Sequence, residues 1–438
     1  MIVRQLVICG ILMAWSVALG QPSQQNWPHW RGPLGTGAAP EGNPPVNWSE
    51  STNIKFKVAI PGSGSATPII WNDRIYLHTA IRTGGSPAQP AERPAGGRGG
   101  LSTGKPTVPY QFVLLCLDRL TGKTLWQKTL REEIPHEGHH PTHGFASGSP
   151  VTDGRHIYSF FGSRGLYCLD MDGNLLWQKD LGKMQTRNSF GEGATPALHG
   201  NTLVVNWDHE GEDFIAAFEA STGNELWRTP RDERTSWATP LILTHGGKPQ
   251  VVVSATNRIR SYDLATGKQI WECAGMTDNV IPTPVLFNDM VLAVSGYRGN
   301  SAMAIRLGRE GDLTGTDAIA WKHTRSTPYV PSPLLYGKRL YFLAGNTSVL
   351  TCLDAQTGKT LIDAHRIESM RDVYASPVGA GGRVYLVGRD GSCAVIKDAD
   401  ALEVLSTPKL DEGIDASPVV VGNDLYLRGQ KHLYRIAE

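Results

Sequence analysis

The chain has 438 residues, with 42 Lys and Arg against 41 Asp and Glu, so its formal net charge at pH 7 is +1. A chain without an overall basic field does not bind nucleic acid by neutralising phosphates, so we expect no nucleic-acid partner. The 49 Gly and 28 Pro, with 40% hydrophobic residues, predict a globular protein rich in tight turns rather than a low-complexity chain.

Residues 1–20 predict a signal peptide that is removed on export. Arg4 precedes an apolar run that ends at Leu19, and Ala18 and Gly20 supply small residues at the −3 and −1 positions of a cleavage site. The alternative is a membrane anchor, but the run is shorter than the roughly 20 residues that a spanning helix requires. We therefore expect a periplasmic or secreted bacterial protein that keeps no integral membrane segment after cleavage and works as a monomer.

Residues 21–52 form a lead-in segment that precedes the first repeat. The segment contains Trp27, Trp30 and Trp48, and we expect it to pack on the outside of the folded domain.

A small hydroxyl residue followed by proline recurs eight times along the rest of the chain, which indicates a repeat architecture. The proline spacings of about 41 to 49 residues, with one longer interval, are typical of four-stranded propeller blades. The longer interval contains an insertion at residues 82–109, rich in Gly and Pro. The eight pairs are Thr67-Pro68, Ser149-Pro150, Thr195-Pro196, Thr239-Pro240, Thr283-Pro284, Ser332-Pro333, Ser376-Pro377 and Ser417-Pro418.

The repeat predicts an all-β fold, a single eight-bladed propeller of four-stranded antiparallel blades over residues 53–438. Proline cannot donate to a strand ladder and is confined to strand starts and edge strands, so each Ser/Thr-Pro pair opens the innermost strand. Trp126, Trp177, Trp227 and Trp271 recur on the fourth strand, where an indole can fill the wedge between blades. The last repeat lacks a fourth strand, so residues 53–60 are expected to close the ring.

These phased copies, with turns such as LDRLTGK and YDLATGK, resemble the PQQ-like β-propeller repeat family, which includes the eight-bladed BamB-type propellers. The WPHWRGPLGTG stretch at residues 27–37 is similar to exported bacterial members of that family. The resemblance implies the fold. It leaves function open, because the family includes quinone dehydrogenases, which use pyrroloquinoline quinone (PQQ) with calcium, as well as assembly scaffolds.

Long loops are expected to share one face of the ring, and the candidate ligand-binding residues lie on them. The aromatic and acidic members suit a sugar, a polyol or a peptide. They could equally plug the top of the channel. The candidates are His139, His140, His143, Glu192, Asp208, Trp237, Tyr329, Arg371, Tyr374 and Asp415.

The loop HEGHHPTH at residues 136–143 is the densest cluster of histidines. His136, His139 and His143, with His209 from the next long loop, are the candidate ligands of a Zn²⁺ or Cu²⁺ ion. The spacing matches no strong metal signature. A polar site without a metal and a loop that holds no ligand remain alternatives.

Two classes of function follow. The first is a non-catalytic binding or scaffold propeller that holds a small ligand, a glycan or a protein partner of the cell envelope. The second is an enzyme, either a carbohydrate hydrolase or lyase that pairs Glu192 with Asp208 or Asp415, or a PQQ-dependent oxidoreductase. The adjacent cysteine pair of the family's dehydrogenases is missing, and Cys116, Cys168 and Cys352 occupy one repeated position where we expect small buried side chains.

Overall fold

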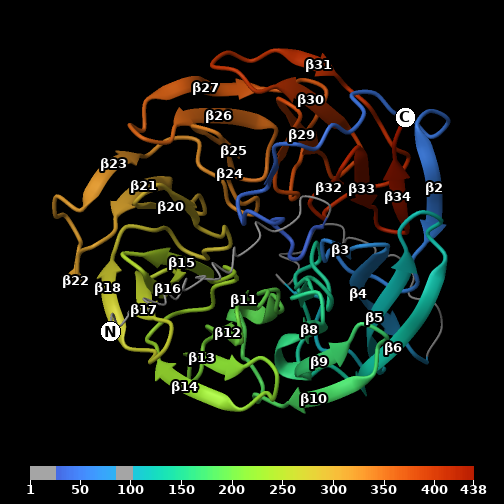
Figure 1. The fold of residues 1–438 in the computed structure, drawn as a ribbon, viewed down its shortest axis with the longest axis horizontal. Coiled ribbons are helices and arrows are strands. Elements are labelled where there is room, and N and C mark those ends of the chain that lie inside the picture. Colours follow the sequence, from blue (N-terminus) through green and yellow to red (C-terminus); the bar gives the residue numbers. More distant parts are fainter. Residues whose placement is uncertain (1–25, 85–101) are drawn as a thin grey trace, which may run out of the picture.

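The computed structural model describes residues 26–84 and 102–438, so the predicted signal peptide and the middle of the 82–109 insertion lie outside the described residues. Eight small antiparallel sheets surround a central channel (Figure 1). The predicted all-β eight-bladed propeller is therefore confirmed. Within the described part of the chain no helix is long and apolar enough to cross a bilayer.

The first four blades follow one another in chain order, each running from an inner to an outer strand (Figure 1). Blade 1 contains β3 (Ile69–Trp71), β4 (Arg74–Arg82), β5 (Tyr110–Asp118) and β6 (Thr124–Glu133). Blade 2 contains β7 (Val151–Thr152), β8 (His156–Phe160), β9 (Leu166–Asp170) and β10 (Leu175–Lys179), with the 3₁₀ turn η1 (Gly162–Arg164) between β8 and β9. Blade 3 contains β11 (Ala197–His199), β12 (Thr202–Trp207), β13 (Phe214–Glu219) and β14 (Glu225–Pro230), preceded by the 3₁₀ turn η2 (Arg187–Ser189). Blade 4 contains β15 (Leu241–His245), β16 (Lys248–Val253), β17 (Ile259–Asp263) and β18 (Gln269–Cys273), and the short β22 (Gly311–Asp312) pairs with β18.

The remaining blades repeat this plan. Blade 5 contains β19 (Val285–Phe287), β20 (Met290–Ser295), β21 (Ser301–Arg306) and β23 (Ile319–His323). Blade 6 contains β24 (Leu334–Tyr336), β25 (Arg339–Leu343), β26 (Val349–Asp354) and β27 (Thr360–Arg366). Blade 7 contains β28 (Val378–Ala380), β29 (Arg383–Val387), β30 (Cys393–Lys397) and β31 (Val404–Ser406), and β1 (Ala38–Ala39) pairs in parallel with β28. Blade 8 contains β32 (Val419–Val421), β33 (Asp424–Arg428), β34 (His432–Ile436) and β2 (Ile54–Ala59).

The N-terminal strand closes the ring, as the sequence predicts. β2 is the fourth strand of blade 8 and pairs antiparallel with β34 near the C-terminus. β2 therefore covers the outer edge of β34, which the three strands from the C-terminal repeat would otherwise leave unpaired.

The repeated tryptophans join neighbouring blades. The indole N–H of Trp227 in blade 3 donates to the carbonyl of Leu264 in blade 4 at 2.9 Å, and Trp177 donates in the same way to Ala220. The turn glycine of the next blade packs against the indole. A Cβ on Gly267, whose φ is +71°, would lie 2.5 Å from the Trp227 ring. The Thr-Gly turn therefore requires glycine both for its backbone conformation and for the close approach of the tryptophan.

The Ser/Thr-Pro pairs form hydrogen bonds that link the inner strands around the channel. The N–H of Ser332 donates to Ser376 Oγ at 2.9 Å, the N–H of Ser376 donates to Ser417 Oγ, and Ser417 closes the ring by donating to Thr67 Oγ1 at 3.1 Å. The same bond joins Ser149 to Thr195, Thr239 to Thr283, and Thr283 to Ser332. At six of the eight repeats the hydroxyl before the proline is therefore a junction between blades.

Residues 27–39 of the lead-in lie inside the ring, so the prediction that the segment packs on the outside is wrong for this part. Val46 and Glu50 contact Ser406 and Lys57 on the outer strands of blades 7 and 8, so the end of the lead-in does reach the outside. Trp27 is fully buried and pairs with Ile70 beside the inner strand of blade 1. Arg31 reaches the carbonyls of Pro333 at 2.7 Å and Pro377 at 3.3 Å, on the inner strands of blades 6 and 7. These inner-edge carbonyls need donors, and a segment that crosses the channel supplies them. Burial lowers the pKa of the Arg31 guanidinium to about 9.

The core is divided among the spaces between blades, and the cysteines belong to it. Cys116, Cys168 and Cys352 are buried on the third strands of their blades. Every cysteine of the described residues is unpaired. The expectation of small buried side chains at this repeated position is confirmed.

Candidate functional site

A cavity of about 510 Å³ lies at the mouth of the channel, on the face of the long loops. We call it the basin. Its volume lies within the range of about 300 to 1,000 Å³ that is usual for small-molecule sites. Its floor consists of Trp30 and the inner-strand hydroxyl residues Thr67, Ser149, Thr195, Thr239, Ser332, Ser376 and Ser417. Its wall includes His140, Thr142, His143, Arg187, Phe190, Trp237, Asn279, Tyr297, Arg298, Tyr329, Tyr374 and Asp415.

The lead-in crosses the channel and closes it below the basin. Trp30 lies at the floor, where its indole N–H donates to Thr239 Oγ1 at 3.2 Å. Gly37 packs so closely against Arg31 that a Cβ on it would lie 2.2 Å from Nη2. The arginine and glycines of the WPxxRGPxGxG stretch therefore hold the segment that places Trp30 at the floor.

Aromatic side chains are held firmly in the wall. Tyr297 stacks on Tyr329 with ring centroids 4.7 Å apart, and the indole N–H of Trp237 donates to Gly191 O at 2.7 Å. The Tyr374 ring lies under the Arg389 guanidinium at 3.9 Å, and its hydroxyl is hydrogen-bonded to Thr142 at 2.9 Å. Rings fixed in this way provide flat apolar surfaces without losing side-chain entropy when a ligand binds.

The histidine loop contributes two of its four rings to the basin. His140 Nδ1 lies 2.8 Å from Thr142 Oγ1, and His143 is hydrogen-bonded to Ser147 Oγ and Glu192 O. His139 packs edge-on against Phe145 instead and does not line the basin. Burial lowers the pKa of His143 to about 4 and also lowers the pKa of His140, so both rings are neutral at pH 7.

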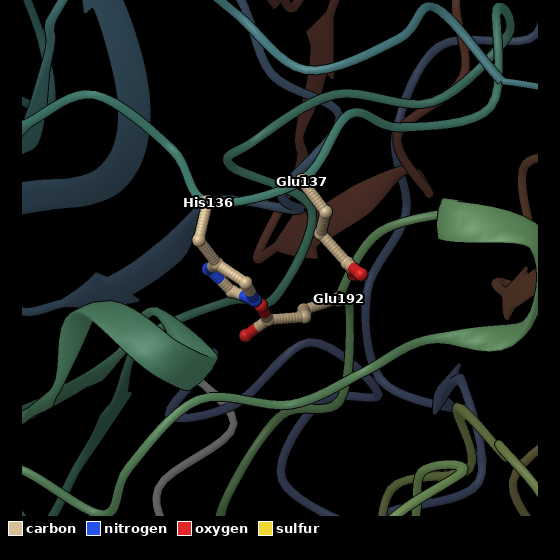
Figure 2. Close-up of side chains that lie close together, drawn as sticks. All are labelled: His136, Glu137 and Glu192. Carbon is tan, nitrogen blue, oxygen red and sulfur yellow. The ribbon is translucent and has the colours of Figure 1, made fainter.

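The structure does not bring together the predicted metal ligands His136, His139, His143 and His209. Within residues 26–84 and 102–438, the one group of three ligand-type side chains whose ligand atoms all lie within 4.8 Å of one another is His136, Glu137 and Glu192 (Figure 2). His136 Nε2 lies 2.6 Å from Met184 O, where its N–H donates, and Glu192 is paired with Arg164. A guanidinium paired with one of the three groups opposes a cation there.

His209 and Arg371 also lie away from the basin. His209 Nδ1 accepts the N–H groups of Gln185 and Gly211, and its Nε2 lies 3.1 Å from Glu212 O, so the ring holds its own loop together. Arg371 is exposed on the surface and does not line the cavity.

Glu192 turns away from the channel mouth, contrary to the prediction that it rings the entrance. Its carboxylate lies 2.5 Å from Arg164 Nη1 and accepts the N–H of Ser163, beside a separate cavity of about 20 Å³ that has room for one water. Both side chains of this ion pair are buried, with 7% and 3% exposed. The residue that follows, Gly193, lines the basin in its place.

The other two candidate acids are also held by arginines. Asp208 is fully buried and binds Arg231 Nε at 2.6 Å, and it also accepts from Ser236 and Asn206. Asp415 does line the basin, but its two oxygens accept from Arg389 at 2.6 and 3.3 Å. Neither proposed acid pair, Glu192 with Asp208 or Glu192 with Asp415, therefore faces a ligand across the basin.

The basin does not fit the calcium that PQQ enzymes use. Ca²⁺ takes six to eight oxygen ligands, with carboxylates among them. Asp415 is the carboxylate among the described lining residues, and Arg389 occupies both of its oxygens. The buried cysteines of the blades do not reach the lining to support a quinone ring.

Sequence reasoning missed several lining residues. Trp30 was placed on the outside, and Arg187, Asn279, Tyr297 and Arg298 were not singled out. Tyr297 and Arg298 lie on the short loop at residues 296–300 of blade 5, and Asn279 lies on the longer connection at residues 274–284 from blade 4 to blade 5. The repeat phase could have identified Tyr297 and Arg298 as lining residues. They follow the second strand of blade 5, β20, and the loops after the second strands lie on the long-loop face.

Buried neutral histidines predict an acid-sensitive fold. Burial lowers the pKa of His78 to about 3 and that of His143 to about 4, whereas the unfolded chain binds these protons near pH 6.5. The unfolded state therefore binds more protons below pH 6.5. The free energy of unfolding is expected to decrease as pH falls from 6.5 to 4, by up to about 1.4 kcal/mol per pH unit for each such histidine.

Urea unfolding at pH 7, 6 and 5 measures this slope, and His78→Asn is the matched variant. The Asn amide keeps a donor for Gly148 O, which His78 Nδ1 contacts at 2.7 Å, but it does not titrate. The variant should show a shallower slope than the parent. Equal slopes would mean that His78 does not contribute to the acid sensitivity.

The fold and the basin together define the class of protein: an eight-bladed β-propeller with a ligand-sized cavity at the mouth of its channel. The family model described as outer membrane protein assembly factor BamB matches residues 111–361 and 211–438. The chain belongs to this family.

One relative and two solved structures illustrate the similarity. The outer membrane protein assembly factor BamB of Burkholderia pseudomallei (strain K96243) is 25% identical over 329 residues, which cover 72% of this chain and 76% of that protein. The crystal structure of BamB from Moraxella catarrhalis superimposes with a TM-score of 0.51 and 14% identity, covering 74% of this chain and 93% of that one. The quinohemoprotein alcohol dehydrogenase from Comamonas testosteroni gives a TM-score of 0.61 at 10% identity, covering 95% and 81%. At these identities the two structures show a shared fold alone.

Proposed function

We propose that this protein is an exported, non-catalytic binding propeller of the bacterial cell envelope that holds a carbohydrate ligand in the basin. The composition of the basin carries this proposal. Tyr297, Tyr329, Trp237 and Tyr374 present aromatic surfaces, and the floor presents a ring of hydroxyl groups. Sugar rings pack against aromatic side chains and exchange hydrogen bonds with hydroxyls.

The cell-envelope location rests on two observations. The family is named after an outer membrane assembly factor, and residues 1–20 have the pattern of a signal peptide. A protein partner of the envelope could reach the same long-loop face. We expect the chain to bind its ligand as a monomer, since all lining residues of the basin come from one ring.

The state of the acids favours binding over hydrolysis. Glu192, Asp208 and Asp415 are each held by an arginine, so none of the three presents a free carboxyl group to a substrate. Glycoside cleavage requires two carboxyl groups that face each other across the substrate. The hydrolase is therefore the alternative that the experiment must distinguish.

Titration of the protein (residues 21–438) with maltotriose, cellotriose, chitotriose and trigalacturonate, followed by tryptophan fluorescence, tests the proposal. At least one trisaccharide should give a saturable change, because Trp30 and Trp237 line the basin. Trp237→Ala should weaken that binding by about tenfold or more, a loss of about 1.4 kcal/mol. Trp126→Ala, on the outer strand β6, is the control variant and should bind normally.

Chromatography of the same mixtures distinguishes the alternative. Unchanged trisaccharides agree with a binding protein, whereas shortened products would replace the proposal with a hydrolase. A panel in which no trisaccharide gives a saturable change, or in which Trp237→Ala binds normally, would overturn the proposal.

A further inference from the structure

The floor of the basin offers hydroxyl groups whose protons are available for donation to a ligand. Thr67, Ser376 and Ser417 each accept the N–H of the preceding blade, so one lone pair of each hydroxyl is engaged. A hydroxyl has one proton to donate. Within residues 26–84 and 102–438, none of these three protons is used by a protein acceptor, and all three hydroxyls line the cavity. The inter-blade bonds therefore leave these three O–H groups available to a ligand.

Two arginines add positive charge to the wall. Arg187 Nη1 donates to Asn279 Oδ1 at 3.1 Å, and its Nη2 lies 3.8 Å from Asp278, beyond hydrogen-bond length. Arg298 packs its guanidinium 5.3 Å from the Tyr297 ring and forms no ion pair with any described residue. Both line the basin, and both keep N–H groups free for a ligand.

The remaining charged groups of the basin do not cancel this field. Asp415 is the carboxylate of the described lining, and its charge is balanced by Arg389. His140 and His143 have lowered pKa values and are neutral at pH 7. Asp278 lies 3.8 Å from Arg187 and offsets part of its charge, so the positive charge of the lining comes mainly from Arg298, with a smaller contribution from Arg187. A ligand that complements this surface is negatively charged and rich in oxygen acceptors.

We infer that the ligand of the basin is a sugar that carries an oxyanion, a carboxylate or a phosphate. Arg187 and Arg298 bind the oxyanion, the floor hydroxyls donate to ring and glycosidic oxygens, and the tyrosines pack on the sugar ring. Guanidinium groups are the side chains best suited to both anions, because their forked N–H groups match two oxygens. This inference rests on the carbohydrate-binding function proposed above and specifies its substrate class.

Calorimetric titration with trigalacturonate, its methyl ester and glucose 6-phosphate tests the inference. The methyl ester is a matched ligand, because it keeps every hydroxyl and loses the charge. Trigalacturonate or glucose 6-phosphate should bind at least about tenfold more tightly than the ester. Whichever of the two binds more tightly shows whether the oxyanion is a carboxylate or a phosphate. Raising the salt concentration should reduce this difference.

Variants connect the effect to the two arginines. Arg298→Ala removes an exposed side chain, and Arg187→Met keeps the aliphatic stem, so both are expected to fold. Each variant should bind the charged ligand about tenfold more weakly than the unmodified protein does. Its affinity for the ester should stay within about twofold of that of the unmodified protein. Arg155→Ala, which removes one positive charge from an exposed turn in blade 2, is the control and should change neither affinity.

The outcomes separate the two proposals. If the ester binds as tightly as the acid and the phosphate, the oxyanion inference is wrong and the carbohydrate function stands. If the arginine variants lose as much affinity for the ester as for the charged ligand, the oxyanion inference is also contradicted. If no sugar binds, charged or neutral, the carbohydrate function itself is wrong.

Discussion

Asp208→Ala is expected to lower the free energy of unfolding by about 3–5 kcal/mol, the largest effect we predict. The Asp208 and Arg231 side chains are both fully buried (0% exposed), with their closest atoms 2.6 Å apart. Loss of the carboxylate leaves Arg231 charged inside the protein, with the hydroxyl of Tyr262 as its remaining partner at 2.6 Å. It also removes the acceptor of Ser236. Urea unfolding at pH 7 measures the change.

An exposed ion pair provides the control for this prediction. Arg325 and Asp363 pair on the surface, with 63% and 55% of their side chains exposed. Asp363→Ala should change stability by no more than about 0.5 kcal/mol, because solvent already screens the interaction. If Asp208→Ala costs no more than Asp363→Ala, the buried pair is not the determinant that its geometry indicates.

Glu192→Ala is expected to destabilise the protein by about 3 kcal/mol while leaving the affinity of the basin nearly unchanged. Arg164 would lose its short contact to Glu192 Oε1, and its Nε and Nη2 already lack hydrogen-bond partners. Its nearest other carboxylate, Glu133, lies 3.8 Å away. A buried guanidinium without an ion pair is costly.

Glu192→Gln and Glu225→Ala are the comparison variants. The glutamine keeps an acceptor for the N–H of Ser163 and should lose less stability than the alanine. Glu225 forms a half-exposed pair with Arg228, and its loss should cost less than about 1 kcal/mol. Thermal unfolding combined with the ligand titration separates the two roles of Glu192. A variant of normal stability that no longer binds would restore Glu192 as a ligand-binding residue.

The fold could be predicted because its signals are local and repeated. Proline at one phase identifies the inner strand, and an Asp-x-x-Thr-Gly turn with the following tryptophan identifies the outer hairpin. Asp263 accepts the N–H groups of Ala265 and Thr266, and Gly267 takes a positive φ against Trp227. Each of these interactions lies within one blade or between adjacent blades, so a repeat is enough to predict it.

The candidate site could be predicted only in part, because side-chain direction within a loop is not fixed by repeat phase. Trp237, Tyr329, Tyr374 and Asp415 line the basin as their phase indicates. Glu192 has the same phase but turns into blade 2, where Arg164 attracts its carboxylate. The sequence cannot indicate this pairing, because it depends on a three-dimensional contact between two loops.

The lead-in could not be placed, because it has no repeat to follow. A segment with three tryptophans suits either an outer surface or a channel. The deciding contacts, from Arg31 to the carbonyls of Pro333 and Pro377, join residues at opposite ends of the chain. A buried arginine that requires Gly37 at its side explains the WPxxRGPxGxG stretch, but only after the structure is known.

Because β2 pairs with β34, a chain synthesised from its N-terminus keeps β2 without a partner until residues 432–436 have been made. A free strand edge during that interval can pair with other chains and aggregate. Lys55 and Lys57 project from β2 into solvent, and charged side chains on an edge discourage such pairing. In the closed ring Lys57 forms an ion pair with Glu50 at 2.7 Å. The lysine that discourages pairing of the free β2 edge therefore also contacts the lead-in once β2 is in place.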